Sequence, residues 1–460
     1  MALLRILSLF LCMGSLAYAQ LLPVLKNPEL LQKPSSNLIL TLRNPLDPIF
    51  SDVASRAFPN REARLQELTR SLQEATQTWH APIMTALKPF NVQAESFWVT
   101  NQISVKNANP LLVRFLRGLA ILREIAEEII YPIMPIFNPS IGTPPNGTEW
   151  GVRIIGAEEV WKKGNKGEGV RVAVIDTGVR ASHTALRENY VGAANNGWYD
   201  PIMRSPVPTD NNGHGTHCTG SICGNNGIGV APNAKWMGCR GCDNAGCPQA
   251  ALLACGQWVI CPTDAQGRNQ DCSKAPHIVS NSWGGGGGGT WFNDVIKAWN
   301  TAGIIGFFAI GNEGPNCNTA GSPGDQAGII SVGSTNINDT VSSFSSRGPK
   351  NVPDGTVAPL IVAPGENINS AYHLSDNGYQ VLSGTSMATP HAAGAAALLL
   401  SGKPGTTIQQ MMDVLYPTTN RNLGATGSTC GNNAETTYPN DVAGYGRIDV
   451  SKAFTTLTGT

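Results

Sequence analysis

Two short apolar runs constrain the fold of this chain most. Residues 172–175 are followed by Asp176, and residues 304–310 are followed by Gly311 and Asn312. A continuous apolar run of this length that ends in turn residues is typical of a strand buried on both faces of a parallel sheet. Helices cover such sheets on both sides, and sites form at the carboxyl ends of the strands. The runs therefore predict a doubly wound, mostly parallel α/β sheet with Asp176 and Asn312 at its functional edge.

A serine near the end of the chain lies where a helix is expected to begin. Ser386 is preceded by Gly384 and followed by Pro390 and an alanine- and leucine-rich run at residues 392–400. Gly384 allows a tight turn, and Pro390 suits the first turn of a helix, where its missing N–H is not needed. Free N–H groups at a helix N-terminus favour the negative charge that develops when a hydroxyl attacks a carbonyl. A simple helix cap is the alternative role for Ser386.

The chain also supplies the partners of a serine nucleophile, which reacts slowly without a base and an oxyanion donor. His214 lies between two glycines, which permit close backbone approach, and is the candidate base. Asp176 is the candidate carboxylate that orients this base, and Asn312 is the candidate oxyanion donor. Turn formation is the alternative for Asp176 and Asn312. Metal ligation by His214 and His217 is a further alternative, but no third ligand at a recognisable spacing defines a metal site.

Together these motifs resemble those of the subtilisin family of serine proteases. Asp-Thr-Gly begins at Asp176, His-Gly-Thr-His begins at His214, and Gly-Thr-Ser-Met-Ala-Thr-Pro surrounds Ser386, in the order of that family. The resemblance extends from about residue 149 to about residue 454, and the run from Cys239 is similar to the bacillopeptidase F branch. It implies a secreted serine endopeptidase. Asp176 would orient the base His214, Ser386 would be the nucleophile, and Asn312 would stabilise the oxyanion.

The resemblance also implies how substrates bind. Ser282, Trp283 and Gly284, together with Gly311, match segments where family members hold an extended polypeptide by main-chain hydrogen bonds. A flexible glycine loop without a contact role is the alternative. No cofactor is expected for catalysis, whereas structural calcium is common in the family. The loop at residues 224–232 is shorter than the usual calcium loop of the family.

The first 145 residues differ from the rest of the chain in their sequence patterns. Arg5 and the apolar run at residues 6–16 are typical of a secretory signal peptide, which we expect to span residues 1–19. Residues 20–145 predict a strand, a helix, two strands, a helix and a strand, which fits a ferredoxin-like α/β unit. An independent binding domain is the alternative. By resemblance this unit is a propeptide that assists folding and inhibits the peptidase domain at residues 146–460 until it is cut away.

A segment rich in proline and glycine at residues 138–148 joins the two parts, and we expect it to be exposed, extended and the region of maturation. Asn146 and Asn338 are glycosylation acceptors in a eukaryotic host and indicate surface loops.

The chain has 11 cysteines. With the signal peptide they favour disulfides in an oxidising compartment over a zinc knuckle, and their pairing stays open. We expect Cys218 to be buried as a small apolar residue rather than to act as a second nucleophile.

Composition argues against two kinds of partner. Basic and acidic residues number 32 each, so no basic excess indicates nucleic acid. Charged residues interrupt the apolar stretch at residues 119–137, so we expect no stable membrane insertion. A catalytically silent secreted binding protein on the same scaffold is the alternative function. Competent residues at Asp176, His214, Asn312 and Ser386 favour the enzyme.

Overall fold

A computed structural model describes residues 22–351, 354–431 and 433–460. The expected signal peptide at residues 1–19 lies outside the described residues. The chain forms two compact units: a small unit of the residues up to Ile49 with Arg70–Ile129, and a large unit of Phe50–Thr69 with Ile130–Thr460. The division crosses helix α4 (Arg61–Leu87), whose first residues group with the large unit.

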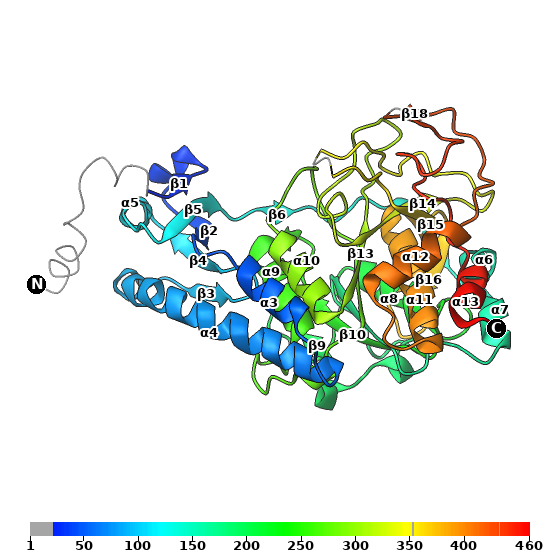
Figure 1. Cartoon of the computed structure of the whole chain (residues 1–460), viewed down its shortest axis with the longest axis horizontal. Helices are drawn as coiled ribbons and strands as arrows, with labels where there is room; N and C mark the ends of the chain where they lie inside the picture. Colours follow the sequence, from blue (N-terminus) through cyan, green and yellow to red (C-terminus); the bar gives the residue numbers. More distant parts are fainter. Residues whose placement is uncertain (1–21, 352–353, 432) are drawn as a thin grey trace, which may run out of the picture. The chain divides into compact units, whose positions relative to one another are not determined.

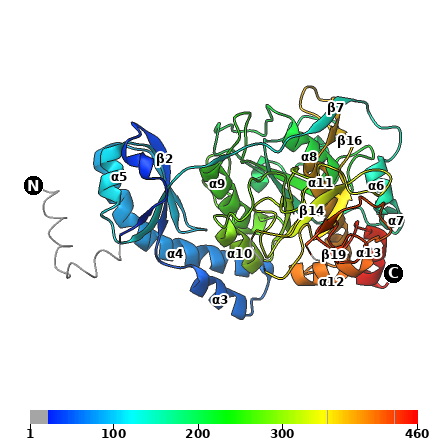
Figure 2. The ribbon, with the colours of Figure 1, turned by 90° about the horizontal axis from the view of Figure 1, so that it is seen from above.

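The small unit carries a five-stranded sheet (Figures 1 and 2). Its strands, in spatial order, are β1 (Val24–Leu25), β5 (Leu122–Glu127), β2 (Ser36–Leu42), β4 (Gln102–Ala108) and β3 (Ala94–Phe97). The last four pair with one another in antiparallel fashion, whereas β1 is parallel to β5. Along the chain, α4 lies between β2 and β3, and α5 (Pro110–Leu116) lies between β4 and β5. This is the ferredoxin-like arrangement expected from the sequence.

Alternating apolar side chains explain the core of the small unit. The core side chains from β2, α4 and α5 include Leu38, Leu40, Leu42, Ile83 and Leu112. The spacing of the three leucines by two places them on one face of β2. Asn109 caps the start of α5, because its side chain accepts a hydrogen bond from the backbone N–H of Leu112 at 2.9 Å.

The large unit contains the predicted parallel sheet. Its seven strands, in spatial order, are β15 (Ile361–Pro364), β14 (Ile330–Thr335), β13 (Ile305–Ala309), β12 (Ile278–Asn281), β8 (Arg171–Asp176), β10 (Lys235–Arg240) and β9 (Trp198–Tyr199). Every neighbouring pair is parallel. The predicted α/β class and the parallel sheet are therefore confirmed.

Helices cover both faces of this sheet (Figure 2). On one face, α11 (Thr385–Gly402) packs against β12 to β15 and against α8 (His214–Cys223). Val172 and Val174 of β8 share that core. On the other face, α9 (Gln249–Ile260) and α10 (Asn293–Ala302) pack against each other and against strands of the sheet. A strand buried on both faces needs apolar residues throughout, which explains the continuous apolar run at residues 172–175.

The other elements are shorter or lie outside the central sheet. They are α3 (Asp47–Ser55), which also crosses the division, and, in the large unit, α6 (Trp150–Ile154), α7 (Ala157–Lys162), α12 (Ile408–Thr418), α13 (Val450–Thr458), β6 (Ile130–Tyr131), β7 (Phe137–Gly142), β11 (Cys247–Pro248), β16 (Ile368–Ala371), β17 (Tyr379–Ser383), β18 (Thr429–Cys430) and β19 (Asn433–Ala434). β7, β17 and β16 form an antiparallel sheet. Part of the join expected to be exposed and extended is thus a largely exposed strand, β7, paired with β17.

The carboxyl ends of three neighbouring strands place the predicted site residues together. β8 ends at Asp176, β12 is followed by Ser282, and β13 is followed after Ile310 by Gly311 and Asn312. Because β8, β12 and β13 are adjacent and parallel, these residues lie along one edge of the sheet.

Disulfides join cysteines that are close in the fold. The four bonds are Cys239–Cys255, Cys242–Cys247, Cys261–Cys272 and Cys317–Cys430. Every cysteine between residues 239 and 272 is thereby paired, which leaves none for the zinc-knuckle alternative. Cys218 and Cys223 are free and buried, so the expected burial of Cys218 is confirmed.

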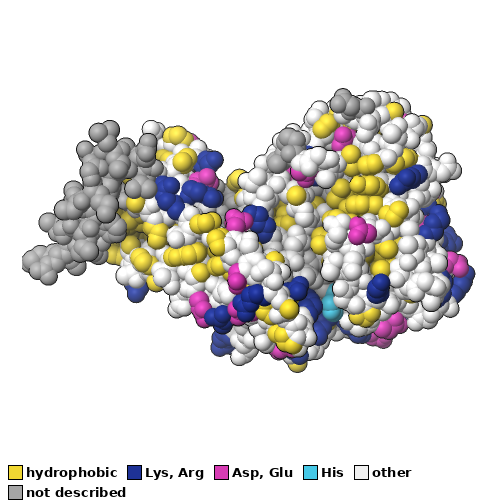
Figure 3. All heavy atoms as spheres, in the orientation of Figure 1, with side chains coloured by type: hydrophobic (Ala, Val, Ile, Leu, Met, Phe, Trp, Pro, Cys, Tyr) yellow, Lys and Arg dark blue, Asp and Glu magenta, His cyan; other side chains and the backbone are white. Residues whose placement is uncertain are grey.

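The surface agrees with the balanced composition. On the face drawn in Figure 3, acidic and basic side chains are interspersed rather than gathered by sign. Among the helices of the described residues, none is both long enough and apolar enough to cross a membrane.

Candidate active site

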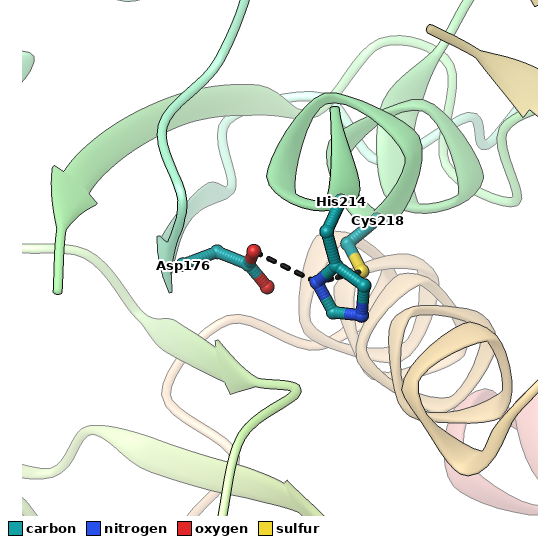
Figure 4. Close-up of side chains that lie close together, drawn as sticks. All are labelled: Asp176, His214 and Cys218. Atoms are coloured by element: carbon teal, nitrogen blue, oxygen red, sulfur yellow. Dashed lines mark hydrogen bonds and ion pairs between the residues drawn. The ribbon is translucent and has the colours of Figure 1, made fainter. Parts of the chain in front are cut away.

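The aspartate and histidine predicted to work together are in direct contact (Figure 4). Asp176 is the last residue of β8, and His214 is the first residue of α8. His214 Nδ1 lies 2.8 Å from Asp176 Oδ1, and both side chains are almost fully buried. A carboxylate at Nδ1 favours the tautomer that carries its proton there and leaves Nε2 free to accept one.

Glycines on either side of His214 make this contact possible, as predicted. A Cβ at Gly215 would lie 2.2 Å from the carbonyl oxygen of Gly178 and 3.0 Å from Cβ of Asp176. Gly213 has a φ of 102°, in the left-handed region that favours glycine. A larger residue at position 215 would separate α8 from the end of β8, and one at position 213 would clash with Tyr372 and His373.

A buried carboxylate that the sequence analysis did not single out ties these two elements together. Asp210 Oδ1 accepts hydrogen bonds from Thr177 Oγ1 at 2.9 Å and from the backbone N–H of Gly213 at 2.8 Å. Its Oδ2 accepts from the N–H and the Oγ1 of Thr216, at 3.0 and 2.6 Å. Thr177 Oγ1 accepts in turn from the N–H of Gly215 at 3.0 Å. The only sequence signal for Asp210 is its place four residues before His214.

Ser386 lies at the N-terminus of α11, as predicted, but Pro390 does not lie in the first turn. The helix begins at Thr385, so Pro390 falls in its second turn. A proline there leaves the carbonyl of Ser386 without its usual helical donor. That carbonyl instead accepts from Ser282 Oγ at 2.9 Å and from Cys218 Sγ at 3.3 Å. Pro390 therefore frees an acceptor that links α11 to the end of β12 and to α8.

Asn312 contacts the start of α11. Its Oδ1 accepts from the backbone N–H and the Oγ1 of Thr385, at 2.9 and 2.8 Å, so Nδ2 is left to donate elsewhere. Nδ2 donates to the carbonyl oxygen of Pro135 at 2.8 Å. The chain bends at Gly384 as expected, between β17 and α11, and the Gly384 carbonyl accepts from the backbone N–H of Met387 at 3.0 Å. Gly384 also provides space, since a Cβ there would lie 3.2 Å from Asn312 Nδ2.

The predicted nucleophile and base are not hydrogen-bonded to each other. Ser386 Oγ donates to the carbonyl of Ser282 at 3.3 Å and lies 3.8 Å from Met134 Sδ. His214 Nε2 is buried and has no hydrogen-bond partner among the described residues. Cys218 lies between the two, with its Sγ 3.3 Å from the carbonyl oxygen of Ser386 and 3.9 Å from His214 Nδ1.

The chain that passes over Ser386 is the protein's own segment at residues 130–142, which we call the crossing segment. At its start β6 pairs antiparallel with β11, and at its end β7 pairs antiparallel with β17. Between these strands Met134 is buried and the carbonyl of Pro135 meets Asn312. Pro132 and Pro135 disfavour a helix, so the segment stays extended. The sequence predicts a join at residues 138–148 but carries no signal that residues 130–137 lie in the site.

The predicted substrate-binding glycines line this segment. A Cβ at Gly284 would lie 3.1 Å from Met134 Cε, and a Cβ at Gly285 would lie 2.6 Å from the ring of Tyr131. That ring stacks on Trp291, with centroids 5.1 Å apart and planes 15° apart. The glycine run therefore leaves room for the side chains of an extended polypeptide at Gly284 and Gly285.

The other predicted substrate-binding residues act through different groups. Ser282 contributes its carbonyl and its hydroxyl, both of which contact Ser386. Trp283 is buried, and its ring packs edge to face against two core phenylalanines. Gly311 has a φ of 116°, and its carbonyl accepts from Thr385 Oγ1 at 3.2 Å.

The two histidines of α8 lie in opposite electrostatic settings. Burial disfavours the charged form of His214, but the Asp176 carboxylate outweighs burial and raises the pKa of His214 well above its usual value. Burial lowers the pKa of His217 to about 3. His217 Nε2 donates to the carbonyls of Ile368 and Gln380, at 3.0 Å each. His217 is therefore a neutral structural residue, and it does not meet His214 at a common point.

Among the described residues, one cluster brings potential metal ligands of different kinds together (Figure 4). Ligand atoms of Asp176, His214 and Cys218 lie within 4.8 Å of one another. Calcium takes about six to eight oxygen ligands. One carboxylate beside an imidazole and a thiol does not fit that ion, so no calcium is assigned to this site.

Comparison with known proteins identifies the family. The Subtilase family matches residues 167–446, more than half of the chain. Bacillopeptidase F of Bacillus subtilis (strain 168) is 32% identical over 436 residues, which cover 88% of this chain and 29% of that protein. This chain thus spans less than a third of that relative.

Two shorter relatives are matched over most of their length. Subtilisin DY of Bacillus licheniformis is 33% identical over 283 residues, which cover 60% of this chain and 92% of that protein. Thermitase of Thermoactinomyces vulgaris is 35% identical over 273 residues, which cover 58% of this chain and 87% of that protein. The chain belongs to the subtilase family.

Proposed function

We propose that this protein is a secreted serine endopeptidase that is made as an inactive precursor. The observation that carries the proposal is the path of the crossing segment. An extended polypeptide lies over Ser386 with a backbone carbonyl, that of Pro135, 2.8 Å from Asn312 Nδ2. A site that holds a peptide carbonyl beside a serine and an amide donor is suited to hydrolysing peptide bonds.

In the proposed mechanism, His214 Nε2 takes the proton of Ser386 as the hydroxyl attacks a peptide carbonyl. Asp176 stabilises the imidazolium that forms. Asn312 Nδ2 and the backbone N–H of Ser386 hold the oxyanion of the tetrahedral intermediate. His214 then gives the proton to the leaving amine, and water hydrolyses the acyl-enzyme with the same histidine as base.

Polypeptide substrates are proposed because the crossing segment is held largely by backbone pairing. β11 pairs with residues before Met134, and β17 pairs with residues after Pro135. Addition of a strand recognises an extended backbone of almost any sequence. Small esters or amides would use neither of these strands.

The precursor organisation follows from the same segment. We propose a signal peptide at residues 1–19, an inhibitory prosegment at residues 20–145 and a peptidase domain at residues 146–460. While the prosegment is attached, the crossing segment occupies the position of a substrate, and Ser386 is not hydrogen-bonded to His214. Asn146 and Asn338 are exposed and are proposed as glycosylation sites.

The test compares the purified full chain with its Ser386→Ala variant. The unaltered chain should shorten by about the length of the prosegment and then digest casein. The variant should stay at precursor length and leave casein intact. Normal maturation of the purified variant would contradict self-processing, and equal casein digestion by both proteins would contradict the role of Ser386.

A further inference from the structure

A second part of the proposed prosegment contacts the large unit away from the crossing segment. Residues 50–69 group with the large unit, although they precede the last strands of the ferredoxin-like sheet in the chain. We propose that Arg61 anchors the prosegment in a carbonyl cradle at the start of β12, so that the prosegment stays bound, and the enzyme latent, after the chain is cut. The inference rests on the proposed function, because latency presupposes a peptidase.

The cradle consists of two backbone carbonyls that point at one guanidinium. Arg61 Nη1 donates to the carbonyl of Ala275 at 3.2 Å, and Nη2 donates to the carbonyl of Pro276. Ala275 and Pro276 are both buried. Arg61 Nε is also buried, and it has no partner within the described part of the chain. A fork of donors that meets adjacent carbonyls is a geometry that arginine provides and lysine does not.

The cradle is held in place from the large unit. It follows the short 3-10 helix η6 (Cys272–Lys274), which Asp271 caps by accepting from the N–H of Ser273 at 3.0 Å. The Cys261–Cys272 disulfide ties this turn to the end of α9. Arg171 Nη1 donates to the carbonyl of Ser273 at 3.0 Å. The acceptors are therefore preorganised before Arg61 arrives, which lowers the entropic cost of binding it.

Other side chains on the first turns of α4 support the contact. Leu65, Leu68 and Thr69 lie four, seven and eight residues after Arg61, so they share its helix face. All three are buried. Thr69 Oγ1 lies 3.6 Å from Cys272 Sγ, and its hydroxyl is the donor because that sulfur is in a disulfide. The first turns of α4 thus form a buried patch in which Arg61 is the charged residue.

Arg61 carries its charge in a buried setting beside a second cation. Burial and the nearby cation Arg171 lower the pKa of Arg61 to about 10. Burial, Arg61 and Arg171 lower the pKa of His277 to about 4. At neutral pH Arg61 is therefore charged and His277 is neutral, and the guanidinium is stabilised mainly by the two carbonyls.

The cradle and the candidate active site lie at opposite ends of one strand. Ala275 and Pro276 precede the amino end of β12, and Ser282 follows its carboxyl end. Cutting the chain after residue 145 removes a covalent link but leaves the contacts of Arg61 intact. The anchor therefore acts on how long the prosegment stays, not on the chemistry at Ser386.

The experiment follows the full-length chain through maturation. Cutting is read on denaturing gels, and activity is read with a peptide substrate in the same samples. A hydrogen bond to a charged group contributes enough that losing it speeds release by about tenfold or more. Arg61→Ala should therefore shorten the delay between cutting and activity about tenfold, whereas Arg61→Lys should have an intermediate effect. Arg70→Ala, an exposed arginine on the same helix, should leave the delay unchanged.

A second measurement covers variants that mature poorly and separates the two proposals. A site for an unrelated specific protease is inserted after Pro145 in the Ser386→Ala chain, which is then cut and passed through gel filtration. The prosegment should elute with the peptidase domain when Arg61 is present and separately in Arg61→Ala. Equal co-elution in both, or equal delays for Arg61→Ala and Arg70→Ala, would overturn the anchor. An unaltered chain that never becomes active would instead contradict the proposed function.

Discussion

The two halves of the candidate active site differ in how completely they are assembled. On the side of the base, Asp176 meets His214 at 2.8 Å, and Asp210 ties their elements together. On the side of the nucleophile, Ser386 Oγ faces Met134 Sδ and the carbonyl of Ser282 instead of the base. The inhibition that we propose for the crossing segment would therefore leave the Asp176–His214 pair in place and act on Ser386 and Asn312.

The largest loss of activity is expected from Asp176→Asn, which tests the Asp176–His214 pair. The amide keeps the shape of the carboxylate but favours the wrong histidine tautomer, so kcat should fall by about four powers of ten.

The pH profile of Asp176→Asn should move as well. His214 must be neutral to accept a proton, and its raised pKa means that activity is lost as pH falls through a value above the usual 6.5 or so. Removing the carboxylate lowers that pKa, so the acid limb of kcat/KM should shift to lower pH. An unshifted limb would show that Asp176 does not set the charge of His214.

Asn312→Ala tests the other half. The variant loses the donor that meets the carbonyl of Pro135, and kcat should fall by about two to three powers of ten, with a smaller change in KM. Asn316→Ala, four residues later and exposed, serves as the control. Full activity of Asn312→Ala in processed enzyme would remove Asn312 from the mechanism.

A smaller effect is expected where the crossing segment meets Trp291. The Tyr131–Trp291 stack contributes about 0.5–1.5 kcal/mol. Tyr131→Ala and Trp291→Ala should each speed release of the prosegment about two- to tenfold, measured as the delay between cutting and activity. Because they remove one contact, the double variant should be no faster than the faster single variant. Additive effects would mean that the two rings act separately.

The smallest effect on activity is expected from Cys218→Ala, because the thiol is a packed neighbour rather than a reactant. Activity should change by less than about tenfold. In the unaltered enzyme, a mercurial at Cys218 would place bulk 3.9 Å from His214 Nδ1 and block the reaction. Cys218→Ala should therefore resist the mercurial, whereas Cys223→Ala, which removes the other free thiol, should remain sensitive. Equal sensitivity of both variants would mean that the mercurial acts elsewhere.

Sequence patterns predicted those features that are local. The apolar run before Asp176 and the glycines around His214 specify a buried strand and a close approach within a few residues, and both were found.

Features that depend on contacts distant in the sequence were not predicted. Pro390 was expected in a first helical turn because no residue near it in the sequence shows that the Ser282 hydroxyl replaces the missing N–H as a donor to Ser386. The pairing of Cys317 with Cys430 spans 113 residues. The positions of the crossing segment and of Arg61 depend on contacts with residues far along the chain. Local sequence patterns therefore do not predict them.

We propose that Ser386 is a peptidase nucleophile kept from reacting by the crossing segment. The most direct measurement is labelling with a fluorophosphonate probe during maturation of the purified chain, beside a Ser386→Ala control. We expect no labelling of the precursor, strong labelling once the prosegment has left, and no labelling of the control at any time. Processed protein that stays unlabelled, or a precursor that labels as fast as the processed enzyme, would contradict it.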